Sequence, residues 1–560
     1  MLRGLAATET SGVPEWLKDS WREPEPFYRA LHAHVGDTSP APLKSRPFED
    51  QDLYHDLVVR HLKEGRDAFI AHAAGAGWHR LSYEELHTRT TALAAAWEAA
   101  GVLAGQTVAI VLPVSEEYVV ALLTALRLGA VVSVLPPRGA SFVRRRLKEL
   151  APEQVVSHPR YAALLGERAR GLLPTSPSAD PPTGWLARSH TYAPGDTVAR
   201  LFSPLSPTPE KPVELKAAAL GLGLLRDAVL VLGLRPGDRV ALPGFEPLQY
   251  QPHALLVTLL AGGCFLEVEA RALTDEAVQK LLAPTVVGIS PDLRTLLLAG
   301  EVSPERWRLW LRNVAEPYDW DRWEQFGAVM ATHRRCQGMN LVTNAAFGGS
   351  LLFSPAQPKP GSFSVLPTPG QPWRLADLLG TGQPSHGESG LYAATGEGLD
   401  EATFGRFLLS HTRTGYFFAG TPRLGSRGQT YPEREVLEVV EAHPDVLGAT
   451  VVITPGGAPL LHSSLVKLLV FIDPAGEPSS LVGVLEPELK RRIDVELGER
   501  YRPDTLHYYP LSPRRTDQGG IDRDWCRWQF LSGTLDRKAG HELFRMLGHL
   551  RQLLTRVHEP

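Results

Sequence analysis

The first clear pattern in this chain is an amphipathic stretch over residues 82–100, in which apolar residues recur at helical spacing. Ser82 stands at its start and Glu85 three positions later, an arrangement typical of a helix whose first turn is capped by both side chains. Gly101 follows directly and predicts the end of this helix.

Runs of consecutive apolar residues come next. Residues 107–112 and 130–135 are almost wholly apolar, which is typical of strands buried on both faces. The residues between them predict a helix over 115–128. Strand, helix and strand in this order favour a parallel α/β sheet covered by helices on both faces.

The same alternation returns further along the chain. It predicts a helix around residues 215–232, a strand after Pro236 and Gly237, a helix that ends at Gly262, and a strand over 265–268. Similar alternation continues to about residue 353. We therefore predict a large N-terminal region of layered α/β sheets.

The pattern changes near residue 421. Residues 171–198 and 355–390 are rich in Pro, Gly and Ser and predict linkers or long loops. A compact α+β unit is predicted from a helix over 433–441, strands over 449–453 and 465–472, and a helix over 485–497. We expect two domains, residues 1–424 and 425–560.

Composition narrows the class of protein. A chain of 560 residues with 43% hydrophobic and 21% charged residues is typical of a globular protein with several domains or subdomains. Its net charge of −4 offers no electrostatic basis for binding nucleic acid. Three cysteines without a paired spacing favour neither a disulfide framework nor a zinc site, so no metal is expected. No signal peptide or membrane span is evident, which predicts a cytoplasmic protein.

A collinear set of segments resembles one known family, the acyl-CoA synthetases and other adenylate-forming enzymes. The segments are residues 81–86 (LSYEEL), 105–109 (GQTVA), 125–132 (ALRLGAVV), 236–240 (PGDRV), 443–446 (HPDV) and 449–452 (ATVV). The resemblance covers about residues 80–525 and implies that family's fold, a large N-terminal domain and a small mobile C-terminal domain with the active site between them. In that family ATP adenylates a carboxylate, and the acyl group then passes to a thiol.

The family's phosphate-binding loop corresponds to residues 201–213, and this segment departs from it. A phosphate loop needs glycines that let backbone N–H groups approach the phosphate. Here there is no glycine, and four prolines lack the N–H altogether. Lys211 matches the family's lysine, whereas Ser203, Ser206 and Thr208 are the remaining hydroxyls. An ordinary Pro-rich turn is the alternative interpretation of this segment taken alone.

Three further positions depart from the resemblance. The family's Tyr-Gly-x-Thr-Glu motif corresponds to residues 342–346, where Ala345 and Ala346 replace the residues that bind phosphate and Mg²⁺. Thr421 stands where the family has its ribose-binding aspartate, and Gly520 where it has the adenylating lysine. Four departures together predict that ATP and Mg²⁺ are not used.

An acyl pocket and a channel for a phosphopantetheine arm do not depend on ATP. The resemblance therefore implies an acyltransferase that carries an acyl group, aryl in the leading hypothesis, from coenzyme A to an acyl carrier protein, as do starter-loading relatives in aromatic polyketide biosynthesis. An intact aryl-CoA ligase is a further expected partner. Two alternatives remain open: a divergent ATP-dependent acyl- or aryl-CoA ligase, and a non-catalytic scaffold that binds a carrier protein or a ligase.

Substrate-binding residues are expected at two places. One is Phe245 and Glu246, where the family has a wall of the acyl pocket, and the other is Val342, Thr343 and Asn344. Glu246 could accept a hydrogen bond from the substrate or act as a base, and a solvated loop carboxylate is the alternative.

The sequence does not identify a catalytic residue, and four candidates remain. Cys336 and Cys264 are candidate nucleophiles, and Glu246 and His253 are candidate acid–base groups. For both cysteines a buried structural role is the competing interpretation, and His253 is also expected more often to be structural. Cys526 follows the segment that contains Gly520 and is a further thiol to consider.

Overall fold

The structure is a computed structural model that describes residues 13–38, 41–73, 77–176, 184, 188–203, 211–314, 320–333, 335–358, 360, 364–376, 389–394, 407–412, 415–420, 433–455, 464–473, 478–515 and 521–540. The chain divides into two compact units, Met1–Pro137 with Val143–Pro422, and Arg138–Phe142 with Arg423–Pro560. The division falls beside the expected boundary at 424, which stays a prediction because residues 421–432 lie outside the described part.

The first unit contains a five-stranded sheet with the strand order β5–β3–β4–β6–β7. Its strands are β3 (Thr107–Val111), β4 (Val131–Leu135), β5 (Gln154–Ser157), β6 (Thr197–Phe202) and β7 (Pro212–Lys216). The first four strands run parallel and β7 returns antiparallel beside β6. Every residue of β3 and β4 is buried, as their apolar runs predicted.

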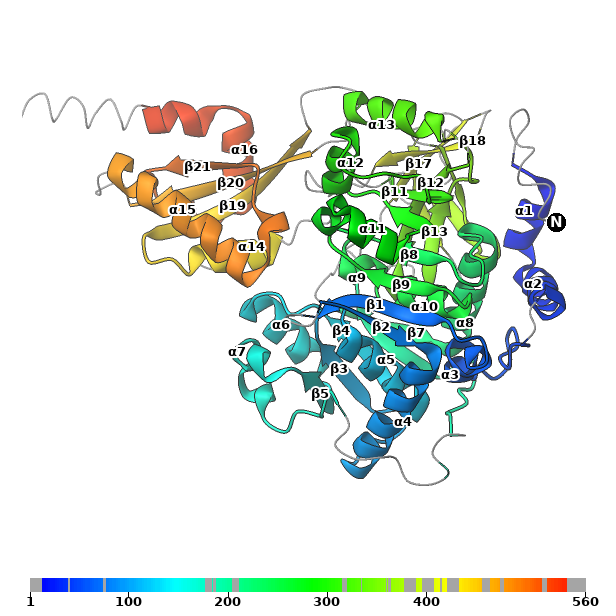
Figure 1. Ribbon diagram of the computed structural model, residues 1–560. Helices are drawn as coiled ribbons and strands as arrows, with labels where there is room; N and C mark the ends of the chain where they lie inside the picture. The colour runs from blue at the N-terminus through cyan, green and yellow to red at the C-terminus, as the bar shows by residue number, and fades with distance from the viewer. Residues whose placement is uncertain are drawn as a thin grey trace, which may run out of the picture. The chain divides into compact units, whose positions relative to one another are not determined.

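Helices of the first part of the chain are α1 (Glu15–Arg22), α2 (Pro24–Thr38), α3 (Leu53–Leu57), α4 (Tyr83–Ala99), α5 (Glu116–Leu128), α6 (Ala140–Leu150) and α7 (Ala162–Leu165). Helix α5 packs on β3 and β4, and α4 packs on α5 (Figure 1). The predicted capping box is present: the Glu85 N–H donates to Ser82 Oγ at 3.1 Å, and the Ser82 N–H donates to Glu85 Oε2 at 3.0 Å.

A second sheet of thirteen strands has the order β15–β16–β17–β18–β14–β13–β12–β11–β10–β8–β9–β1–β2. Its first strands along the chain are β1 (Asp67–Ala73), β2 (Gly77–Ser82), β8 (Arg239–Ala241), β9 (Cys264–Glu267), β10 (Val286–Gly288), β11 (Leu309–Asn313) and β12 (Gln337–Asn344). The others are β13 (Gly349–Phe353), β14 (Ser364–Pro367), β15 (Trp373–Ala376), β16 (Ser389–Ala394), β17 (Phe407–Thr412) and β18 (Gly415–Gly420). Strands β1 and β8 to β12 run parallel.

The helices between these strands are α8 (Ala217–Arg226), the π-helix η6 (Asp227–Val231), α9 (Pro247–Tyr250), α10 (His253–Leu260), α11 (Glu276–Leu282), α12 (Pro291–Leu298) and α13 (Trp320–Thr332). Short 3₁₀ helices are η2 (Val59–His61), η3 (Pro159–Tyr161), η4 (Gly166–Ala169), η7 (Ala270–Thr274) and η8 (Ala345–Phe347). The helix predicted around 215–232 begins only at Ala217 and changes to π geometry at Asp227. Its expected start is wrong because residues 212–216 pair with β6 instead.

Both faces of the parallel strands are packed. One face carries a cluster of buried apolar side chains from β8, β10, β11, β12 and β13, among them Val240, Val286, Leu311 and Leu341. On β11, Trp310 meets Phe326 of α13 edge-on, with ring centroids 5.1 Å apart. Apolar area buried in this way supplies most of the stabilisation of an α/β sheet.

The second unit contains a three-stranded sheet of β19 (Val446–Pro455), β20 (Ser464–Ile472) and β21 (Thr505–Tyr509). Its helices are α14 (Glu433–Glu441), α15 (Pro478–Glu496), the 3₁₀ helix η10 (Glu499–Tyr501) and α16 (Arg523–Leu531). The predicted small α+β unit is therefore confirmed, although β19 and α15 are longer than expected. Among the described residues, no helix combines the length and apolarity that a membrane span requires.

Candidate functional site

Parallel strands create a natural place for a site at their carboxyl ends, because loops and helix starts converge there. In the thirteen-stranded sheet, β8 ends just before residues 242–246, and β12 ends at Asn344. The short helix α9, which follows Glu246, packs against β12 and against the turn η8. The structure therefore brings together the two predicted substrate-binding segments, Phe245–Glu246 and Val342–Asn344.

Phe245 forms an aromatic wall at this edge. Its ring lies against Tyr250, with centroids 4.7 Å apart, and only 8% of the residue is exposed. A Cβ at Gly288 would stand 2.7 Å from Phe245 Cζ, so glycine at that position makes room for the ring. Phe245 is thus held in place from the β10 side and the α9 side.

Glu246 is buried rather than solvated, with 3% of its surface exposed. The alternative of a solvated loop carboxylate is therefore wrong. Its Oε1 accepts a hydrogen bond from the Leu248 N–H at 3.2 Å, which caps the first turn of α9. This carboxylate positions α9 beside the end of β12.

The side chain of Asn344 joins the two sheets of the first unit. Its Nδ2 donates to Ser203 Oγ at 2.8 Å, across a sequence separation of 141 residues. Its Oδ1 accepts from the Ala346 N–H at 3.3 Å. Thr343 Oγ1 lies 3.3 Å from Ser350 Oγ, and Val342 is completely buried. The three predicted residues thus form the packed end of β12, where their role toward a substrate stays a prediction.

The turn after Asn344 decides whether Mg²⁺–ATP, which the fold family implies, fits this site. Ala345 and Ala346 are each 1% exposed, and η8 packs against β6 and β7. Mg²⁺ requires oxygen ligands, usually carboxylates together with phosphate oxygens. Residues 342–347 contain no carboxylate. Within the described ranges, no group of three or more His, Cys, Asp or Glu is placed to hold a metal ion. The donor set at this turn does not fit Mg²⁺–ATP.

The segment predicted to be a reshaped phosphate loop joins β6 to β7. Ser203, directly after β6, is completely buried, and Lys211, directly before β7, is exposed. Lys211 makes no ion pair within the part of the chain that the structure describes. The other predicted positions of the nucleotide site, Ser206, Thr208, Thr421 and Gly520, lie outside the described residues.

The three cysteines are all buried. Burial raises the pKa of the Cys264 thiol to about 12 and that of the Cys336 thiol to about 12, and burial also raises the pKa of Cys526. A thiol with such a pKa contains almost no thiolate at neutral pH. Cys336 precedes β12 and is thus at the end of the strand opposite Asn344. These geometries support the structural interpretation of the cysteines.

His253 belongs to a buried cluster of charges that the sequence analysis did not anticipate. Asp227 Oδ2 lies 2.7 Å from His253 Nε2, and Asp227 Oδ1 accepts from Arg226 Nε at 2.7 Å. The Ser350 N–H also donates to Asp227 Oδ2 at 2.7 Å. Burial alone would raise the pKa of Asp227, but the Arg226 charge and the hydrogen bond from His253 hold it well below its usual value. The signal in the sequence was an Arg-Asp pair inside an otherwise apolar helix.

This cluster lies next to the end of β12, since Ser350 on β13 pairs with Thr343 and Gly349 pairs with Asn344. A Cβ at Gly349 would stand 2.5 Å from both Asp227 Oδ2 and His253 Cε1. The close approach of the β13 backbone thus depends on glycine. Because Nε2 of His253 faces Asp227, the other ring nitrogen, Nδ1, is the one directed elsewhere.

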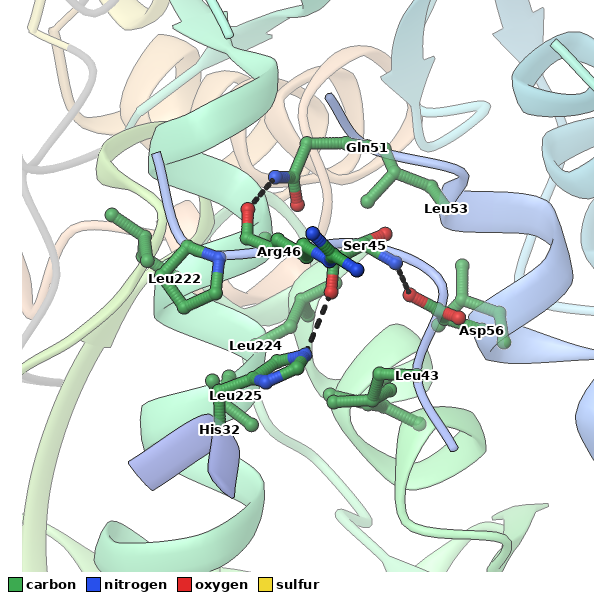
Figure 2. Close-up of a pocket in the computed structure, with 14 residues that line it drawn as sticks. His32, Leu43, Ser45, Arg46, Gln51, Leu53, Asp56, Leu222, Leu224 and Leu225 are labelled. Carbon is green, nitrogen blue, oxygen red and sulfur yellow. Dashed lines mark hydrogen bonds between the residues drawn. The ribbon is translucent and has the colours of Figure 1, made fainter. Parts of the chain in front are cut away.

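Two hollows in the first unit lie apart from this edge. One is a cavity of about 30 Å³ lined by several leucines, in which His32 Nε2 lies 2.9 Å from Ser45 O and the Ser45 N–H donates to Asp56 at 3.0 Å (Figure 2). That volume holds about one water molecule. The other, of about 300 Å³, includes Pro284 and Trp307, which precede β10 and β11, so it lies at the amino ends of these strands. None of the predicted site residues lines either hollow.

Comparisons with known proteins agree with this architecture. Residues 59–173 match the family model described as AMP-binding enzyme, and this range contains the first three motifs of the sequence analysis. An acetoacetyl-CoA synthetase from Streptomyces lividans is 17% identical with a TM-score of 0.61, over 92% of this chain and 90% of that one. An acyl-CoA synthetase from Brucella canis is 18% identical with a TM-score of 0.56, over 92% of this chain and 99% of that one.

Among curated proteins, no sequence matches this chain significantly. At identities of 17% and 18% the structural likeness concerns the fold, which is the layered α/β fold with a small α+β unit that the sequence predicted. Residues 59–173 are thus similar to the AMP-binding enzyme family, and the chain shares its fold with the two acyl-CoA synthetases.

Proposed function

We propose that the protein transfers an acyl group from coenzyme A to the phosphopantetheine thiol of an acyl carrier protein without ATP. The observation that carries this proposal is the turn η8, where Ala345 and Ala346 are buried at the positions that, by the resemblance, correspond to the phosphate and Mg²⁺ ligands. The scaffold of an acyl-CoA synthetase supports an acyl-CoA as the donor.

The proposed reaction needs no nucleotide because one thioester replaces another. The C–S bond between the acyl group and coenzyme A breaks, and a C–S bond to the carrier's phosphopantetheine forms. The proton of the incoming thiol ends on the thiol of coenzyme A. Atoms and charges balance, and the two thioesters are close in energy.

Where the transfer passes through an acyl-enzyme, the chain must supply a nucleophile. The raised pKa values and the burial of the cysteines argue against a thiolate. Ser203 and Thr343 both bring hydroxyls to the described site, and Ser203 also stands at the start of the predicted reshaped loop, where its Oγ accepts from Asn344 Nδ2. We assign Ser203 as the candidate nucleophile in place of Cys264 and Cys336.

The direct test mixes the protein with benzoyl-CoA and a holo-carrier protein in the absence of ATP, and follows the intact mass of the carrier. We expect a mass increase of one benzoyl group on the holo-carrier and none on the apo-carrier, which lacks the phosphopantetheine thiol. A Ser203→Ala variant should lose any benzoyl adduct on the enzyme itself. If no acylated carrier forms from a panel of aryl- and alkyl-CoA esters, the proposal is wrong.

Two other outcomes correspond to the alternative functions. Pyrophosphate release from a carboxylate, ATP and Mg²⁺ would identify a divergent ligase. Stable binding of a carrier protein or of an aryl-CoA ligase, with neither reaction, would identify a scaffold. Titration calorimetry with Mg²⁺–ATP separates the ligase from the transferase. A ligase must bind Mg²⁺–ATP and release or absorb heat, whereas the transferase does not need to bind the nucleotide.

A further inference from the structure

We propose that Gln249 determines which acyl group is accepted, by binding an uncharged hydrogen-bonding substituent on an aryl acyl group. This inference rests on the proposed function, because it assigns the substrate class of the same site. It starts from three polar residues in the segment from Gln249 to His253. Gln249, Gln251 and His253 are 0%, 7% and 3% exposed.

Polar atoms of these three side chains have no hydrogen-bond partner. They are Gln249 Nε2, Gln249 Oε1, Gln251 Oε1 and His253 Nδ1. Buried polar atoms in native proteins are almost always paired, and each unpaired one calls for an explanation. Gln249 is the clearest case, since neither end of its amide is satisfied although the residue is completely buried.

The position of Gln249 connects it with the candidate site. It lies on α9, which packs against β12 and η8, the elements that hold Val342 to Ala346. Phe245 and Tyr250, on either side of it in the sequence, form the aromatic pair described above. An aryl group is the kind of ligand that would complement such a pair, since aromatic rings favour offset or tilted contacts.

The chemistry of the unpaired atoms defines the substituent. The Gln249 amide offers N–H donors and one acceptor oxygen, and Gln251 offers a second acceptor oxygen. A hydroxyl, which donates and accepts, satisfies such a set. A charged substituent is disfavoured beside Gln249, because an uncharged amide in a completely buried position offers it no counter-charge. We therefore assign an uncharged polar group, with hydroxyl as the probe.

The test compares binding of benzoyl-CoA, 3-hydroxybenzoyl-CoA and 4-hydroxybenzoyl-CoA by titration calorimetry. We expect the wild-type protein to bind at least one hydroxybenzoyl ester tenfold or more tightly than benzoyl-CoA. Gln249→Met keeps the length of the side chain and removes the amide, and should bring this ratio close to one while benzoyl-CoA still binds. Gln249→Leu provides a second variant if the methionine protein fails to fold.

The matched control is Gln337→Met at the exposed amino end of β12, which should keep the wild-type ratio. A wild-type protein that does not distinguish the three esters, or binds none of them, overturns the inference, and so does a Gln249→Met protein that retains the preference. Binding is measured without a carrier protein. A preference for hydroxybenzoyl-CoA without any transfer would therefore sustain this inference while the proposed function fails.

Discussion

Replacing Asp227 by Asn tests the charge cluster beneath the candidate site. The side chains of Asp227, Arg226 and His253 are 1%, 3% and 3% exposed, so no water compensates for a lost interaction. Asparagine keeps the shape but not the charge. Arg226 Nε donates to one carboxylate oxygen, and His253 and Ser350 face the other, so the new NH₂ group must meet a donor whichever way the amide turns.

The expected cost follows from leaving Arg226 buried without a counter-charge. Removing one partner of a buried ion pair costs about 3–5 kcal/mol, so we expect the free energy of unfolding to fall by about 4 kcal/mol. A second change, Arg226→Met, removes the unpaired guanidinium. The double variant should therefore be more stable than Asp227→Asn alone, a non-additivity that a double-mutant cycle measures.

The assay is urea unfolding followed by tryptophan fluorescence. Trp525 and Trp528 are the tryptophans of the second unit, and replacing both with Phe makes the signal report on the first unit. Asp19→Asn is the control, because the Asp19 and Arg22 side chains are 62% and 63% exposed, and such pairs contribute below about 1 kcal/mol. A loss below about 1 kcal/mol for Asp227→Asn, or additive single changes, would refute the reasoning.

Two further predictions concern single side chains. Cys264→Ala and Cys336→Ala should keep the transfer rate within about twofold. Because the pKa values of both thiols are raised to about 12, iodoacetamide at neutral pH should label them only after the protein unfolds. Rapid labelling of the native protein would contradict this. Burial and the charge of Glu269 raise the pKa of Glu267 from 4.5 to about 8. Between pH 4.5 and about pH 8 the Glu267 carboxyl is protonated in the folded state but not in the unfolded state. Unfolding therefore releases a proton, and the contribution of Glu267 to the free energy of unfolding falls as the pH rises. Glu267→Gln should therefore gain thermal stability relative to wild type from pH 5 to pH 8, whereas a pH-independent difference would argue against the shift.

Patterns of neighbouring residues predicted many helices and strands correctly, because caps and buried strands depend on residues that are close in the sequence. The capping box of Ser82 and Glu85 spans one helical turn, and the apolar runs of β3 and β4 need only burial on both faces. The start of α8 was misplaced for the opposite reason. Residues 212–216 alternate apolar and polar side chains, but this strand signal is short and runs directly into the apolar helix that follows; the segment pairs with β6. Pairing between segments is set by the tertiary fold, which outweighs local propensity.

The same distinction applies to the site. Phe245 and Val342 to Asn344 were predicted as two separate substrate-binding segments, and the structure brings them to one edge of the sheet. The bond between Asn344 and Ser203 joins residues 141 positions apart, and His253 meets Asp227 across 26 positions. Contacts between residues so far apart in the sequence leave no periodic pattern from which they could be predicted. The burial of Gln249 is likewise a property of how α9 packs on β12, and no spacing in the sequence reports it.

Two of the segments that the sequence analysis matched to ATP motifs, the turn after Asn344 and the segment that begins at Ser203, are in contact in the structure. Asn344 uses its amide to hold Ser203 at the start of the reshaped loop, and the next two residues are alanines that are 1% exposed. A carboxylate at position 346 would have to be buried there, and a buried carboxylate is stable only when it is paired or bound to a metal. Restoring one motif therefore meets the packing of the others. If the proposed function holds, pyrophosphate release would therefore require the turn at residues 345–346 and the segment that begins at Ser203 to change together.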